Sequence, residues 1–279
     1  MKIILGDNQF FGINHYDLKK GNKSKKIFGN TEDIKKFIKD SLEIGLDGFM
    51  INSNKIGYEL ISGYNQKNNE EIHYSVPYPH KYASIVNESG MLYLLKYFIQ
   101  RTSIFVILKC IFPYIFTRNL KYLIPLAVNL EIPKNLKRGS AVYLQNIITD
   151  LVLGLKKVDF LEEFVKYVRS KGYKPGLITL NPILLDKVIE KSEILNEKDL
   201  IICFNINVSG FNVFPNKTDV INFLSKNKNY KRMGMSIFSS GGGNIADSIS
   251  FIKKLELDYI VFGSSKLKNI RSNYNSFKT

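Results

Sequence analysis

The sequence predicts an α/β protein built as a (β/α)8 barrel, and three observations lead to this. Eight short apolar segments with strand character recur along the 279 residues. Helical patterns separate several of them, and such alternation is typical of parallel sheets, because each return between parallel strands needs a crossover. Eight units in a chain of this length match a TIM barrel. An open doubly wound sheet is the alternative, but the turn after the first segment lacks its usual G-x-G-x-x-G pattern.

The elements follow from local patterns, with β-branched and aromatic runs for strands and apolar residues on one face for helices. The predicted strands cover residues 2–5, 47–52, 72–78, 140–148, 176–181, 200–208, 232–238 and 258–265, and the predicted helices cover 30–45, 158–172, 182–193, 217–226 and 244–255. Asn30 or Thr31 is expected to cap the first helix. Asp159 and Glu162 have the spacing of a capping box. Residues 272–279 are expected to form a loose tail.

The segment 90–133 lies between the third and fourth predicted strands and is longer than a crossover helix requires. We expect a helical insertion that Pro113 and Pro125 break into two or three helices. From Met91 to Leu130 it carries five basic residues and no acid. Two interpretations stay open: a lid packed over the barrel mouth, or peripheral contact of 91–129 with an anionic membrane. The rest of the chain shows no linker, so the sequence predicts a single TIM-barrel domain, 1–279, with this insertion.

Composition narrows the classes of partner and compartment. The formal net charge is +15, but lysines are spread over most predicted helices, so no nucleic-acid face is expected. Cys110 and Cys203 lie in apolar runs without zinc-ligand spacing, which predicts buried thiols in a reducing compartment. The apolar run at the N-terminus is too short for a secretory signal. We therefore expect a cytoplasmic protein, with membrane contact through the insertion as the alternative.

Polar side chains recur where the predicted strands end. Active sites of (β/α)8 barrels lie at the carboxyl ends of the strands, so these side chains are expected to meet at one mouth. The predicted substrate-binding residues are Asn8, Asn52, Asn181, Asn205, Asn207 and Ser236. Any single asparagine could instead cap a helix or hold a turn. Phe10 and Phe11 are expected to wall the mouth or to pack against the insertion.

Five residues are candidates for catalysis. Asp7 is a candidate general base, and His15 or His80 would be its acid–base partner because histidine titrates near neutral pH. Lys81 would polarise a carbonyl or form a Schiff base. Asp150 lies among apolar residues and is either catalytic, a helix cap or part of a buried ion pair. No pair of these residues has metal-ligand spacing on a helix, so no metal is expected.

Two glycine- and serine-rich turns follow the last two predicted strands. The predicted phosphate-binding residues are Ser240, Gly241, Gly242, Gly243, Gly263, Ser264 and Ser265. Glycines let backbone N–H groups turn toward an anion, and a following helix N-terminus adds positive potential. Barrels often bind phosphate with the loops after strands seven and eight. The alternative is an ordinary loop with Asn244 and a serine as helix caps.

Two stretches resemble aldo/keto reductases: "DYIVFGSSKLKNIRSN" (258–273), with a turn similar to the one that holds the NADP phosphate, and "FMINSNKIGYELISG" (49–63). More closely, the chain resembles an uncharacterised TIM-barrel family related to them. This second resemblance rests on "GDNQFFGINH" (6–15), "PYPHKY" (77–82), "TDLVLGL" (149–155) and "PGLITLN" (175–181). It covers nearly the whole chain and implies the barrel fold, but its motifs name no reaction.

The reductase resemblance implies an NAD(P)-dependent oxidoreductase with Lys81 and Tyr58 in catalytic roles. Asn52 stands where that family has an aspartate, and Gln145 or Asn146 where it has a histidine. A neutral amide cannot support a cationic lysine as a carboxylate does. The sequence therefore favours a lyase, aldolase or isomerase that acts on a phosphorylated or otherwise anionic, carbohydrate-like small molecule without a cofactor. The alternatives are a reductase with NADP and a non-catalytic barrel on a membrane surface.

Overall fold

Eight parallel strands close into a barrel in chain order, and β8 pairs with β1. The structure is a computed structural model that describes residues 1–12, 27–64, 70–77, 96 and 99–279. The strands are β1 (Lys2–Leu5), β2 (Gly48–Asn52), β3 (Glu71–Val76), β4 (Ala141–Leu144), β5 (Lys174–Ile178), β6 (Ile201–Asn205), β7 (Lys231–Met235) and β8 (Tyr259–Phe262). The predicted (β/α)8 fold is thereby confirmed.

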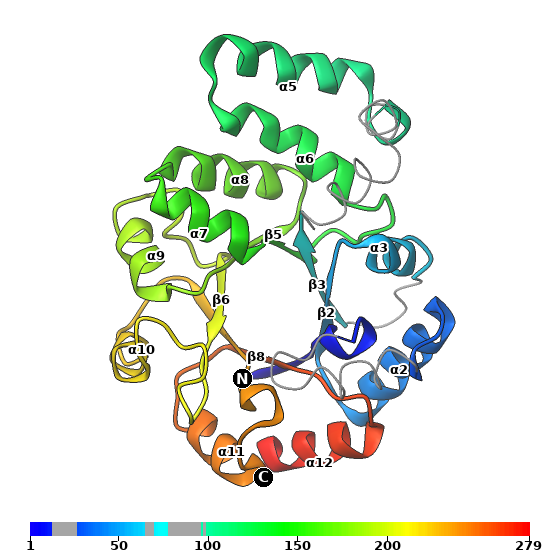
Figure 1. The fold of residues 1–279 in the computed structure, drawn as a ribbon, viewed down its shortest axis with the longest axis vertical. Helices are drawn as coiled ribbons and strands as arrows, with labels where there is room; N and C mark the ends of the chain where they lie inside the picture. The colour runs from blue at the N-terminus through cyan, green and yellow to red at the C-terminus, as the bar shows by residue number, and fades with distance from the viewer. Residues whose placement is uncertain (13–26, 65–69, 78–95, 97–98) are drawn as a thin grey trace.

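Helices surround this barrel (Figure 1). The outer ring holds α2 (Thr31–Ile44), α3 (Lys55–Ser62), α8 (Val158–Ser170), α9 (Pro182–Ile189), α10 (Lys217–Leu224), α11 (Ile245–Lys253) and α12 (Leu267–Lys278). The additional elements are η1 (Asn8–Phe10), α5 (Ile104–Thr117), η2 (Leu120–Leu123), α6 (Ile124–Glu131), α7 (Asn146–Gly154) and η3 (Ser239–Gly241). A continuous apolar layer between strands and helices forms the larger core.

A second core fills the inside of the barrel, where Ile4, Cys203 and Met233 pack together. His73 of β3 is fully buried there, and its Nδ1 lies 2.7 Å from the hydroxyl of Tyr143. Burial lowers the pKa of His73 below its ordinary value. These contacts give His73 a structural place in the barrel interior. Asn30 caps α2 as predicted, because its Oδ1 accepts the Asp33 N–H at 2.9 Å.

Three local predictions are wrong. The strand predicted over 140–148 ends at Leu144, because the Gln145 carbonyl accepts N–H groups from the first turn of α7. Residues 272–278 belong to α12, and Phe277 lies on the buried side of this helix. The capping box of α8 does not form, because Asp159 accepts from the Asn119 amide at 2.9 Å and Glu162 accepts from Ser192, in the loop after α9.

The insertion folds as a helical hairpin beside the barrel. Pro113 lies inside α5 without ending it, and the helix stops at Arg118, whose φ is 53°. Pro125 lies in the first turn of α6. α6 packs against α8, and α5 lies outside α6, away from the strand ends (Figure 1). The described part of the insertion is therefore not a lid over the mouth. None of the described helices is long and apolar enough to cross a bilayer.

Candidate functional site

Asp7 and Asn52 meet where β1 and β2 end. Asn52 donates both its backbone N–H, at 2.8 Å, and its side-chain Nδ2, at 2.7 Å, to the Oδ2 of Asp7. The Oδ1 of Asn52 accepts the N–H of Asn54 at 3.0 Å, which fixes the orientation of the amide. The structure thus brings together one predicted catalytic residue and one predicted binding residue that lie 45 positions apart.

The Asp7 carboxyl titrates close to neutral pH. Burial raises its pKa from 3.8 to about 6, and the hydrogen bonds from Asn52 oppose this rise only in part. The second oxygen, Oδ1, accepts no hydrogen bond from another residue in the described part of the chain. A carboxyl group with such a pKa can both accept and return a proton under physiological conditions. Asp7 is therefore suited to acid–base chemistry.

Gln9 completes the same corner of the barrel, and the sequence analysis missed it. Its Nε2 donates to the carbonyl of Gly6 at 2.6 Å, while its buried Oε1 has no partner within the described residues. A side chain at Gly263, after β8, would occupy the position of this oxygen. Gly263 is thus required for Gln9 to fit. The available signal was a polar residue directly before the buried Phe10.

The remaining residues of this first turn take different places. Asn8 is exposed. Phe10 is buried and meets Phe28 and Phe37 edge-on, with ring centroids 4.9 Å and 6.0 Å away. Phe11 packs at the margin of the same core. The expectation that Phe10 would wall the mouth or contact the insertion is wrong, because its ring packs against Phe37 of α2 and against Phe28, which lies in the segment before that helix.

The turn after β7 has an unusual backbone. Ser236, Ser239 and Ser240 all have positive φ, between 49° and 57°, and Gly241 follows at 87°. Such conformations cost on the order of 1–3 kcal/mol each for residues with a Cβ and cluster at functional sites. The hydroxyl of Ser239 lies 2.7 Å from that of Ser209. The strain is therefore concentrated in the loop predicted to bind phosphate.

The two helix N-termini beside the predicted phosphate site differ. At α11, the Oδ1 of Asn244 accepts the N–H groups of Ala246 and Asp247, so this terminus is capped by the chain itself. Gly241 and Gly242 donate their N–H groups to carbonyls of the same turn, and Gly243 lies beside them. At α12, no side chain caps the first turn. Ser264 and Ser265 precede it half-buried, so of the two helix N-termini that of α12 is less occupied by side chains of the described chain.

Several predicted site residues have structural partners. Asn181 caps α9 by accepting the Leu184 N–H at 3.1 Å. Asn205 and Asn207 donate to carbonyls of the loop 206–213, at 2.9 Å and 2.8 Å, and so hold that loop. Asp150 accepts from Thr179 at 2.5 Å and from the Leu180 N–H, while burial raises its pKa. These contacts account for the four side chains without any ligand.

Three predicted residues, His15, His80 and Lys81, lie outside the described residues, so their roles stay predictions. Within the described part of the chain, no three histidine, cysteine, aspartate or glutamate side chains gather to hold a metal ion. Both cysteines are buried and free, as expected.

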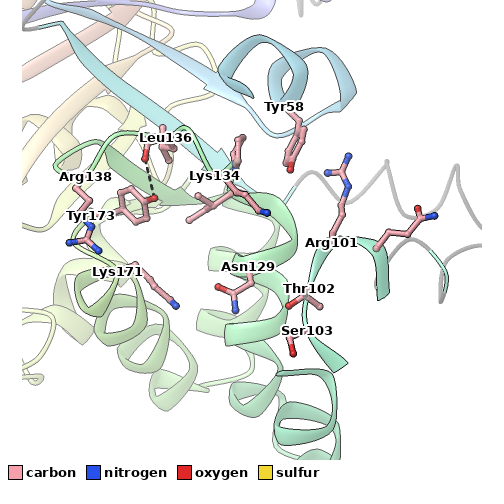
Figure 2. A pocket seen from close by; sticks show the side chains of 13 residues that line it. Tyr58, Arg101, Thr102, Ser103, Asn129, Lys134, Leu136, Arg138, Lys171 and Tyr173 are labelled. Carbon is pink, nitrogen blue, oxygen red and sulfur yellow. Dashed lines mark hydrogen bonds between the residues drawn. The ribbon is translucent and has the colours of Figure 1, made fainter. Parts of the chain in front are cut away.

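A basic cavity of about 670 Å³ lies away from this mouth (Figure 2). Its lining includes Arg101, Lys134, Arg138 and Lys171, and none of the described residues that line it is acidic. The guanidinium of Arg101 lies 3.9 Å from the centre of the Tyr58 ring. Arg138 and Lys171 precede β4 and β5, so the cavity is near the amino ends of the strands. Tyr58, which the reductase resemblance places in catalysis, lines this cavity beside Arg101.

The mouth therefore gathers Asp7, Asn52, Gln9 and the turns after β7 and β8. These groups can exchange a proton, accept a hydrogen bond from a ligand and approach an anion with backbone N–H groups. No family model matches the chain, and no curated protein matches it.

Proposed function

We propose that the protein is an enzyme that moves a proton through Asp7 at the carboxyl end of the barrel. Its substrate would be an anionic, carbohydrate-like small molecule, and its reaction an isomerisation or a carbon–carbon lyase or aldolase step. The observation that carries the proposal is the carboxyl group of Asp7, which accepts two hydrogen bonds from Asn52 and whose pKa burial raises to about 6. A group that titrates there can abstract a proton next to a carbonyl and return it in the same turnover.

Two further features support an anionic, hydroxylated substrate. The strained serine turn after β7 and the uncapped first turn of α12 lie where barrels often bind phosphate. The Oε1 of Gln9, which has no partner among the described residues, is an acceptor that a substrate hydroxyl would satisfy. Lysine and arginine outnumber acidic residues by fifteen, which favours the approach of anions over the whole surface.

The first test is a thermal-shift screen at pH 7.5 that pairs each sugar phosphate with its neutral parent sugar. We expect a sugar phosphate to raise the melting temperature and its parent sugar to leave it unchanged. Ser264→Ala should weaken the shift, because this hydroxyl lies in the turn before α12. If no phosphate ester stabilises the protein more than its parent sugar, the anion site is not where we place it.

The second test follows the proton itself. A stabilising ligand is incubated with the protein in deuterium oxide, and loss of a substrate C–H signal is followed by proton NMR. Wild type should exchange the proton, whereas Asp7→Asn should slow exchange by a factor of about 10²–10⁴, the usual contribution of a general base. Asp33→Asn is the matched control, because it removes an equal charge from an exposed position on α2. Undiminished exchange in Asp7→Asn would exclude Asp7 as the base.

A further inference from the structure

The outer face of α5 is apolar where a surface helix is normally polar. Its solvent-facing residues are Ile104 (49% exposed), Phe105 (79%), Leu108 (58%), Phe112 (65%), Ile115 (50%) and Phe116 (73%). Single exposed apolar residues are common on proteins, but a contiguous row of this kind marks a contact surface. We call these six residues the α5 face.

The opposite side of α5 packs against α6. Ile107 and Cys110 are buried against Leu126 and Leu130 of α6. Figure 1 shows α5 as the outermost layer, with α6 and then α8 between it and the barrel. No described element of the barrel packs over the α5 face, so whatever covers it comes from outside the described chain.

Cations predominate around the α5 face, and Asp159 of α8 binds Asn119 and Lys121 just beyond the end of α5. Lys109 and Arg118 are exposed and form no ion pair with the described residues. The chain has no acidic residue between Met91 and Leu130. The basic cavity adjoins the start of α5, since Thr102 and Ser103 line it together with Arg101 (Figure 2). The surroundings of the face are therefore complementary to an anionic surface.

We propose that α5 docks the protein on an anionic lipid bilayer, lying in the plane of the interface. Phe105, Phe112 and Phe116 would enter the boundary between headgroups and acyl chains, and Lys109 and Arg118 would approach lipid phosphates. A helix of 14 residues is about 21 Å long, which suits a flat orientation and is too short to span the membrane. This inference adds a location to the proposed enzyme and does not depend on Asp7.

A second copy of the chain fits the α5 face less well. In a symmetric dimer each face would meet its own copy, which would bring two sets of cations together, and α5 carries no acid to pair them. Anionic lipids supply the missing negative charge. The membrane is therefore the occupant that both the apolar side chains and the charges favour.

The chain has no tryptophan, so one introduced tryptophan reports on its own surroundings. Phe112→Trp places the reporter on the α5 face, and Phe214→Trp is a matched control at another exposed phenylalanine. Vesicles of phosphatidylcholine alone are compared with vesicles that also contain phosphatidylglycerol. We expect a blue shift of the emission of Phe112→Trp with the anionic vesicles only, weakened by added salt. An equal shift in Phe214→Trp, or none in either reporter, overturns the assignment.

Sedimentation with the same vesicles tests the side chains. Wild type should pellet with anionic vesicles, and the triple variant Phe105→Ser, Phe112→Ser, Phe116→Ser should bind at least about tenfold more weakly. The matched triple variant changes Ile147, Leu151 and Leu155 to serine, which removes the exposed apolar row of α7. It should bind like wild type. Circular dichroism melts verify that both variants fold.

Three outcomes contradict membrane docking by α5. Equal pelleting with neutral vesicles would remove the anionic requirement. Unchanged pelleting of the α5 triple variant would place the contact elsewhere. A wild-type dimer in sedimentation equilibrium without lipid, with a monomeric α5 variant, would make a second copy the occupant. The proposed chemistry at Asp7 would survive each of these results, because the deuterium-exchange test uses soluble ligands.

Discussion

Two helices of nearly equal length, α8 and α5, show opposite ways of meeting their surroundings. α8 has 13 residues, and its Phe164 and Val168 are almost completely buried against the barrel. Its outer side is charged, and Arg169 forms a two-pronged ion pair with Asp199 at 2.5 Å and 2.8 Å. α5 has 14 residues and buries little more than Ile107 and Cys110.

The comparison separates residues that stabilise the fold because they are buried within the chain from residues that find no such burial within it. The apolar face of α8 finds its partner within the chain, so its burial contributes directly to folding. The α5 face finds none among the described residues, so its phenylalanines contribute little to the stability of the isolated protein. The mouth shows the same contrast on a smaller scale, because burial raises the pKa of Asp7 and no cation lies beside its carboxyl group among the described residues.

The largest expected effect separates the two helices directly. Phe164→Ala should lower the free energy of unfolding by about 3–5 kcal/mol, because it leaves a cavity between α8 and the barrel. Phe112→Ala should cost less than about 1 kcal/mol, because its ring is exposed and packs mainly against Phe116. Urea unfolding measures both. Similar losses in the two variants would mean that α5 is covered in the protein alone.

The interior of the barrel is closely packed, as is the inner side of α8, so we expect it to tolerate added side-chain volume poorly. Gly176→Ala would place a methyl group where the ring of Tyr143 lies, so we expect a loss of about 1–3 kcal/mol. Gly154→Ala, at the end of α7, meets nothing within 4 Å and should be neutral or gain up to about 1 kcal/mol. Thermal and urea unfolding of the pair provide the measurement. A stable Gly176→Ala would indicate that the interior can repack around Tyr143.

Local patterns were sufficient for the barrel and insufficient for the site. The eight strands were predictable because short stretches of sequence suffice to recognise the alternation of strands and helices. The caps at Asn30 and Asn244 were predictable from the residues beside them. The contacts of Asp7 with Asn52 and of Gln9 with Gly263 join segments that are distant in the sequence, so no local sequence pattern predicts them. The helical structure of the last residues of α12 was not predicted, because polar residues predominate there and a single phenylalanine, Phe277, supplies the buried contact.

The pH dependence of the free energy of unfolding tests the same contrast at Asp7. Its pKa is 3.8 in the unfolded chain and about 6 in the folded protein, so between these values the folded state binds more protons. The free energy of unfolding therefore falls as the pH rises from about 4 to about 6. Asp7→Asn keeps an oxygen that can accept both Asn52 donors but carries no charge, so it should remove this pH dependence.

The variant should match wild type near pH 4 and exceed its stability at pH 7.5 by about 1–3 kcal/mol, since one pKa unit corresponds to about 1.4 kcal/mol. Urea unfolding at both pH values, with Asp33→Asn as control, measures the difference. An Asp7→Asn protein that is less stable than wild type at pH 7.5 would show that the carboxylate is satisfied by partners in the folded protein. If Asp7→Asn is more stable than wild type and no longer exchanges the substrate proton, then the carboxylate that destabilises the folded protein is also the group that carries out the proposed chemistry.

The smallest expected effect concerns the strained turn after β7. Ser240 has φ 55° and ψ 26°, a conformation that glycine adopts without penalty. Ser240→Gly should therefore raise the free energy of unfolding by up to about 1 kcal/mol, because relief of strain exceeds the added freedom of the unfolded chain. Gly243→Ala is the matched control, since its φ is not positive and its new Cβ would meet only ordinary contacts. If the strain positions backbone N–H groups for an anion, Ser240→Gly should also weaken the thermal shift given by sugar phosphates. A gain in stability with unchanged ligand response would make this turn, like the α8 face, purely structural.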